Sequence, residues 1–155
     1  LLAAERIALT ASTAVDGTVV RLGGLYGPDR YRLERYLEGP VTEGYLNSTH
    51  RDDAAGAVGH LLTTGRGRGE VVLAVDDEPV SKWGFADWLA DQCGVPHPPK
   101  RTAEERAAAT DGDVPRRFRA SKRCANDRLH ELGYEPRFPS VRDGYRPAIE
   151  AYRAT

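Results

Sequence analysis

The sequence contains no methionine, only two cysteines and no long apolar run. A membrane-spanning helix needs about 20 consecutive, mainly apolar residues, so the composition argues against an integral membrane protein. Cys93 and Cys124 are too few for a disulfide-stabilised scaffold and lack the spacing of a metal site. No basic segment followed by an apolar one marks a secretion signal. We therefore expect a cytoplasmic protein with reduced thiols and no metal.

The chain also lacks an excess of either charge, with 22 lysines and arginines against 23 aspartates and glutamates. Proteins that bind nucleic acid usually carry a clear basic excess, so nucleic acid is disfavoured as a partner. With 155 residues, 40% of them hydrophobic, the chain can form one domain, or part of one, around a buried core.

The beginning of the sequence also departs from that of an ordinary reading frame. It opens with Leu1 instead of methionine and continues at once into an apolar, helix-like run through Leu9. Such a run is typical of the middle of a domain. We therefore expect the sequence to be a fragment of a longer protein.

Helix-like and strand-like segments alternate along the chain. Runs of β-branched and other apolar residues predict strands over 18–22, which Gly23 and Gly24 should end, and over 70–75. A short extended stretch near 45–46 is a candidate edge strand. Helices are expected over 1–11, 31–38, 52–62, 81–93, 102–109, 127–132 and 140–152. This alternation predicts an α/β fold with a parallel sheet.

Two details of these helices can be predicted as well. Ser81 and Asn126 have the residue types and positions of N-caps. The helix over 52–62 should bury one face, formed by Ala55, Val58, Leu61 and Leu62.

The first candidate site is the carboxyl end of the strand over 18–22, because ligands bind at that end of the strands in open α/β sheets. Gly23 and Gly24 remove two side chains there, so a flat ligand could approach the backbone. An ordinary turn from strand to loop is the alternative explanation.

Three polar clusters are weaker candidates. His50 precedes Asp52 and Asp53 at a predicted helix start, where it could act as a general acid/base or merely order the loop. The acidic turn over 76–78 has no partner cluster, so turn and capping roles explain it better than a metal. A basic cluster over 116–123 could bind phosphate, but the acidic stretch before it also allows simple charge neutralisation.

Four segments, in this order, resemble one family: Val20 to Pro28, His50 to Ala55, Ala74 to Val80, and Ser121 to Leu129 followed by Leu132 to Pro136. Their order and spacing resemble the C-terminal half of the extended and atypical short-chain dehydrogenases/reductases, the NAD-dependent epimerase/dehydratase family. The resemblance covers nearly the whole chain.

This resemblance implies the C-terminal portion of a Rossmann-like, doubly wound parallel sheet. Residues 1–80 would belong to the NAD(P)-binding domain, and residues 81–155 to a mostly helical substrate-side region whose final helix packs back on the core. It also implies NAD or NADP as cofactor. The nicotinamide would be bordered by Leu22, Gly23, Gly24 and Leu25.

On the substrate side, the resemblance points to His50 and Arg123. The family's glycine-rich loop and catalytic tyrosine would lie before residue 1, and Leu1 would occupy the position of the catalytic lysine, so no catalytic residue is assigned. The short segment over 29–49 indicates a small substrate region, which weakens the case for a sugar nucleotide.

Two functions remain open on this basis. The first is an NAD(P)-dependent oxidoreductase or epimerase-like enzyme of the atypical branch, acting on a small molecule such as a sugar or nucleotide sugar. The second is a non-catalytic NAD(P)-sensing or nucleic-acid-associated protein on the same fold. A homodimer is compatible with either.

Overall fold

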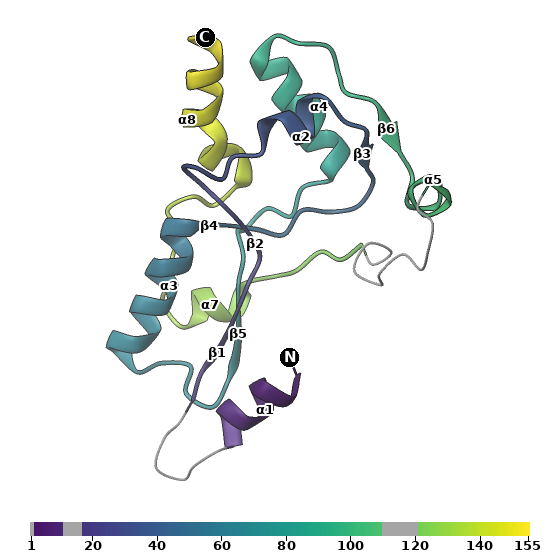
Figure 1. Ribbon diagram of the computed structural model, residues 1–155. Helices are drawn as coiled ribbons and strands as arrows, with labels where there is room; N and C mark the ends of the chain where they lie inside the picture. The colour runs from purple at the N-terminus through teal and green to yellow at the C-terminus, as the bar shows by residue number, and fades with distance from the viewer. Residues whose placement is uncertain (1, 11–16, 110–120) are drawn as a thin grey trace.

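A computed structural model describes residues 2–10, 17–109 and 121–155 (Figure 1). The helices are α1 Leu2–Thr10, α2 Leu33–Leu37, α3 Arg51–Thr64, α4 Lys82–Cys93, α5 Ala103–Ala108, α7 Asp127–Glu131 and α8 Val141–Arg153. The strands are β1 Val19–Leu22, β2 Gly24–Tyr26, β3 Val41–Thr42, β4 Ser48–His50, β5 Val71–Ala74 and β6 Lys100–Arg101. Leu1 and the basic residues 116–119 lie outside the described ranges.

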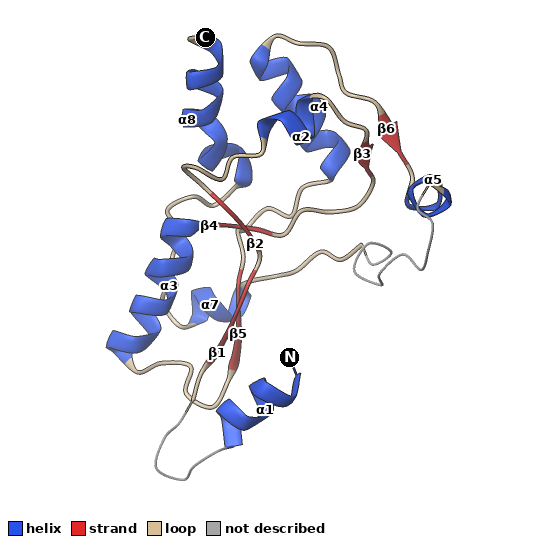
Figure 2. Ribbon diagram, viewed as in Figure 1, coloured by secondary structure: helices blue, strands red, loops and turns tan. Residues whose placement is uncertain are grey.

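Parallel pairing joins these strands two by two: β1 with β5, β2 with β4, and β3 with β6 (Figure 2). In the longest pair, Val19 lies opposite Val71 and Leu22 opposite Ala74. Parallel neighbours require a crossover connection, and α2 lies on the segment that connects β2 to β4. The predicted α/β fold with parallel strands is confirmed.

Two apolar clusters form the core. One lies where α4 and α8 meet the end of β2, and it contains Tyr26, Val80, Phe85, Leu89, Val141, Tyr145 and Ile149. The other lies between β5, α3 and α7, and it contains Ala57, Leu61, Val72, Ala74, Leu129 and Leu132. In Figure 1 the first cluster corresponds to the upper group of helices, and the second to the lower end around β1 and β5. The polypeptide passes from one to the other through β2 and β4.

The first strand ends at Leu22, directly before Gly23, as predicted, but a second strand, β2, follows at once from Gly24. The extended stretch near 45–46 is reduced to one antiparallel bridge between Tyr45 and Ser81, whereas the neighbouring strands are β3 and β4.

The N-cap predictions had different outcomes. Ser81 caps α4, because its hydroxyl accepts a hydrogen bond from the backbone N–H of Gly84 at 3.0 Å. Asn126 occupies the N-cap position of α7 but makes no side-chain cap bond. Its buried amide instead donates to the Val75 carbonyl at 2.9 Å and to Asp77 Oδ1 at 2.6 Å. The Asn126 side chain therefore bonds the residues that follow β5 instead of capping α7.

The predicted buried face of α3 was also wrong, apart from Leu61. The helix buries Asp53, Ala54, Ala57 and Leu61, whereas the side chain of Leu62 is 78% exposed. The cause lies in contacts from the C-terminal segment. Tyr134 packs against Gly56, and Asp53 bonds the backbone over 137–138. Because of these contacts, α3 is oriented so that mainly its small residues, and not the bulkier ones, face the core.

In the described part of the chain, no helix has the length and apolar character needed to cross a membrane. Cys93 and Cys124 are both free and partly buried.

Candidate functional site

The crossing between β1 and β2 is held together by Gly23. Its N–H donates to the Thr49 hydroxyl at 2.9 Å, and that hydroxyl donates to the Ala74 carbonyl at 2.6 Å. A Cβ at Gly23 would lie 2.5 Å from the Asn47 carbonyl oxygen, whereas one at Gly24 would make an ordinary contact at 3.6 Å. Close backbone packing therefore explains Gly23, and only Gly24 leaves surface that a ligand could use.

Gly24 and Leu25 border a cavity of about 250 Å³, which we call the aromatic cavity. Four of its walls are the aromatic side chains Tyr26, Tyr36, Phe85 and Tyr145. The rings of Tyr36 and Tyr145 each meet Phe85 edge to face, with centroids 5.0 Å apart. Burial raises the pKa of Tyr145 to about 12, so its hydroxyl keeps its proton well into the alkaline range. The aromatic walls lie beside Gly24 and Ser48, the first residues of β2 and β4, close to the carboxyl end of β1.

A second cavity, of about 440 Å³, lies next to the first, and we call it the basic cavity. Arg35, Tyr36 and Lys82 line both cavities and so form their shared wall. Arg101 and Arg106 extend the basic cavity away from Gly24 and Leu25. We refer to these two adjacent cavities, which are lined by residues of α2, α4 and the β3–β6 pair, together as the groove.

The charge along this groove is of one sign. Its cationic side chains are Arg30, Arg32, Arg35, Lys82, Arg101 and Arg106, and no carboxylate lines either cavity within the described ranges. Burial, together with the nearby guanidinium groups of Arg35 and Arg106, lowers the pKa of Lys82. The only hydrogen bond of the Lys82 ammonium within the described ranges is a long one, 3.4 Å, to the Glu43 carbonyl. An anion would relieve this repulsion.

The sequence analysis missed these cations. Arg30, Arg32 and Arg35 occur within six residues, a signal that was present but was interpreted only as part of a short helix. Lys82 and Arg101 gave no local signal, because they reach the groove only after α4 and β6 pack beside α2.

His50 does not reach the groove. It is 3% exposed, and its ring lies between Tyr26 at 5.2 Å and Phe138 at 3.9 Å, measured between centroids. Its Nδ1 accepts from the Asp52 N–H at 3.3 Å, so the imidazole caps α3. Burial lowers its pKa, which keeps the ring neutral, as an N-cap acceptor must be. Its predicted substrate contact stays a prediction.

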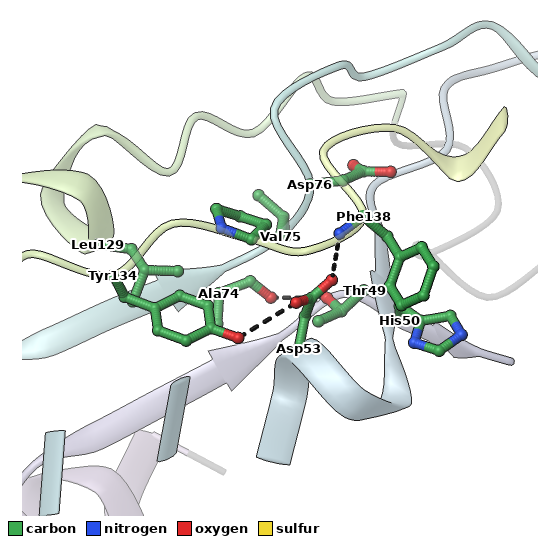
Figure 3. Close-up of a pocket in the computed structure, with 10 residues that line it drawn as sticks. Thr49, His50, Asp53, Ala74, Val75, Asp76, Leu129, Tyr134 and Phe138 are labelled. Carbon is green, nitrogen blue, oxygen red and sulfur yellow. Dashed lines mark hydrogen bonds between the residues drawn. The ribbon is translucent and has the colours of Figure 1, made fainter. Parts of the chain in front are cut away.

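Asp53 fastens the C-terminal segment to α3 (Figure 3). Its two oxygens accept from the Tyr134 hydroxyl at 3.1 Å and from the backbone N–H groups of Arg137 and Phe138 at 2.7 and 2.9 Å. The cavity beneath it measures only about 10 Å³, roughly the space of one water molecule. This arrangement is structural, since it leaves no room for a substrate.

Asp76 is a buried carboxyl group at the end of β5. Burial raises its pKa to about 7, against a backbone hydrogen bond from Ser48, whose N–H lies 3.4 Å from Oδ1. Its Oδ2 has no hydrogen-bond partner within the described ranges. Among these residues, Asp76 is therefore poised to carry a proton near neutral pH.

The remaining candidates lie at the surface. The Arg123 guanidinium lies over the Tyr45 ring at 5.4 Å, and its segment is tied down by Asn47, which bonds the backbone of Lys122 and Cys124 at 2.9 and 2.7 Å. Asp77 pairs with His130 at 2.8 Å, and Glu78 with Arg142 at 2.8 Å. Within the described ranges, no group of three or more histidines, cysteines or carboxylates could hold a metal ion.

Comparison with known proteins places this geometry in a wider context. No family model matches the chain. A curated relative, a 3-diazoavenalumate denitrifying reductase from a Streptomyces species, is 34% identical over 154 residues, which is 91% of this chain and 50% of the relative. The chain therefore spans about half the length of the curated relative it matches.

Two solved structures share the fold. A conserved protein of unknown function from Silicibacter pomeroyi is 26% identical with a TM-score of 0.73, covering 99% of this chain and 54% of its own. The human epimerase family protein SDR39U1, solved with NADPH, is 18% identical with a TM-score of 0.73, covering 90% and 50%. This chain thus has the Rossmann-like α/β fold of these structures and matches about half of the length of each.

Proposed function

We propose that this chain forms the substrate-side half of an NAD(P)-dependent oxidoreductase. The observation that carries the proposal is the aromatic cavity, which opens beside Gly24 and Leu25, just beyond the carboxyl end of β1, a strand parallel to β5. That edge is where α/β folds of this kind bind a dinucleotide and its substrate. Oxidoreduction is preferred to epimerisation because the curated relative is a reductase.

The cofactor side of the proposal rests on Leu22 to Leu25. The side chains of Leu22 and Leu25 are 42% and 37% exposed, although apolar side chains at a strand end usually pack against something. A nicotinamide ring would cover them, and the human protein of the same fold was solved with NADPH. The cofactor supplies or accepts the hydride, and the residues of this chain bind and orient the substrate.

The substrate side draws on both parts of the chain. Residues 1–80 supply the cations of α2 and its approach, and residues 81–155 supply Lys82 and Phe85. The protonated hydroxyl of Tyr145 is a hydrogen-bond donor to a substrate oxygen. Arg123 remains the exposed one of the two predicted substrate contacts, with its guanidinium over the Tyr45 ring.

The test is a titration of NADPH and NADH into the complete protein that contains this chain, followed by intrinsic and nicotinamide fluorescence. We expect saturable binding of at least one dinucleotide. Leu25→Asp should weaken it about tenfold or more, because a carboxylate would replace apolar contact with the ring. Leu62→Asp, at a side chain 78% exposed on α3, is the matched control and should leave binding unchanged. A folded protein that binds neither dinucleotide would overturn the proposal.

A further inference from the structure

We propose that Ser48 is a specificity-determining residue of the aromatic cavity, where its hydroxyl binds a neutral carbonyl or hydroxyl oxygen of the substrate. This role rests on the proposed function in one respect: the bound oxygen would lie beside Gly24, next to the place assigned to the nicotinamide. Binding of such an oxygen by Ser48 needs no cofactor, so the two proposals can fail separately.

The Ser48 side chain points to the same face of the β2–β4 pair as one wall of the cavity. Successive side chains of a strand alternate between its two faces. Thr49 directs its hydroxyl to the Ala74 carbonyl at 2.6 Å, so Ser48 and His50 share the other face. His50 is paired with Tyr26 across the two strands. Tyr26 and Ser48 both line the aromatic cavity, as this shared face requires.

Ser48 is closely packed, yet the strand beside it leaves space next to its hydroxyl. The residue is 6% exposed. Its partner in the register of the two strands is Gly24, which has no side chain. A Cβ at Gly24 would have only the Asn47 carbonyl oxygen within 4 Å, at 3.6 Å. The Gly24–Ser48 pair therefore leaves room for a ligand beside the hydroxyl.

The hydroxyl of Ser48 is the polar group of this residue that the fold leaves unused. The backbone N–H of Ser48 donates to Asp76 Oδ1 at 3.4 Å, and its carbonyl accepts from the Asp76 N–H at 2.8 Å. The side-chain hydroxyl makes no hydrogen bond to any residue within 2–10, 17–109 or 121–155. A hydroxyl buried without a partner costs free energy, and a ligand oxygen would supply the missing bond.

The neighbouring amide of the lining is occupied, in contrast. Asn47 accepts from the Cys124 N–H at 2.7 Å and donates to the Lys122 carbonyl at 2.9 Å, so both ends of its side chain are used. A hydroxyl both donates and accepts, so Ser48 suits either a carbonyl or a hydroxyl oxygen. The aromatic walls would hold a planar group attached to that oxygen.

The experiment compares two neutral probes of nearly equal shape, acetophenone and α-methylstyrene, by NMR titration of the full chain without a dinucleotide. The probes differ in one group, because a C=CH₂ replaces the C=O. We expect acetophenone to bind about fivefold more tightly or better, as one hydrogen bond to a neutral oxygen provides. Arg30, Arg32 and Arg35 line the same cavity and can also donate to a ketone, so the preference must be shown to depend on Ser48.

Ser48→Ala should reduce this preference to about twofold or less, because it removes the hydroxyl alone. Ser140→Ala is the matched control. Ser140 is 8% exposed, but its hydroxyl donates to Glu78 at 2.7 Å, and among the described residues it is not part of the cavity lining. The control should leave the ratio of the two affinities unchanged.

The same two variants should differ in stability. Ser48→Ala removes a hydroxyl that has no partner in the described fold, so its melting temperature should equal or exceed that of the wild type. Ser140→Ala loses the bond to Glu78 and the cap of α8, so its melting temperature should fall by about 2 °C or more. A purely structural role for Ser48 would lower both.

Equal affinity for the two probes, no measurable binding of acetophenone, or a preference that survives in Ser48→Ala would overturn the role of Ser48. A loss of stability in Ser48→Ala as large as that in Ser140→Ala would overturn it as well, since the hydroxyl would then have a partner in the fold. Because the titration contains no cofactor, a failure of dinucleotide binding refutes the proposed function without touching this result.

Discussion

Asp53 at the start of α3 holds Phe138, a residue 85 positions later in the chain, through a 2.9 Å hydrogen bond from the Phe138 backbone N–H. The same carboxylate accepts from Arg137 and Tyr134. It is 5% exposed, and three donors satisfy its charge. The loop that carries Phe138 in turn covers His50, so the polar clamp and the capped helix form one unit.

Asp53→Asn should therefore destabilise the fold by about 2–3 kcal/mol. An amide has only one oxygen, so one of the two backbone N–H groups would face the NH₂ group and lose its acceptor. Urea unfolding followed by circular dichroism measures this change. Asp52→Asn is the control, since its side chain is 52% exposed, and it should cost less than about 1 kcal/mol. Equal losses in the two variants would contradict the clamp.

Gly23→Ala should destabilise the chain by about 1–3 kcal/mol, as expected of overpacking against a backbone that cannot move away. The added Cβ would lie 2.5 Å from the Asn47 carbonyl oxygen, whereas at Gly24 the same atom would lie 3.6 Å away. Gly24→Ala should therefore unfold near the wild-type temperature. If both variants melt alike, close packing at the crossing of β1 and β2 is not what selects glycine there.

Much of the fold could be predicted because its signals are local. The apolar runs around β1 and β5, and the Ser81 and Gly94 ends of α4, depend only on neighbouring residues. The groove could not be predicted in this way. Its shared wall exists because Tyr36 packs against Phe85 at 5.0 Å, which brings Arg35 beside Lys82.

His50 shows how ambiguous a local motif can be. An imidazole next to two carboxylates has the local pattern of a general base, and nothing in its neighbourhood indicates that Tyr26 and Phe138 enclose it. Burial is a tertiary property, so a local motif alone could not separate an N-cap from a catalytic residue.

His130 should contribute stability that depends on pH. Its ring N–H groups donate to Asp77 at 2.8 Å and to Glu135 at 3.0 Å, and these bonds hold its pKa above the ordinary value of 6.5. The folded state thus binds the proton more tightly than the unfolded state, so the contribution is present below pH 6.5 and disappears as pH rises through the folded pKa. Thermal unfolding of wild type and His130→Gln between about pH 6 and 8 measures it. Their melting temperatures should converge at the upper end, and a constant gap would contradict the assignment.

Asp76 should add a second decline at lower pH. Its pKa is raised from 3.8 to about 7 in the folded chain, so folding favours the protonated acid. Its contribution is full below the unfolded pKa and is lost as pH rises to about 7, above which it stays constant.

Asp76→Asn resembles the protonated form, because it keeps one acceptor oxygen and carries no charge. The free energy of unfolding should therefore fall by roughly 1–3 kcal/mol between about pH 4.5 and 7 in wild type, and by less in the variant. The double variant with His130→Gln separates the two groups, because the His130 contribution is constant below its unfolded pKa. An unchanged slope in Asp76→Asn over this lower range would show that Asp76 ionises normally in the folded protein, with its second oxygen reached by water.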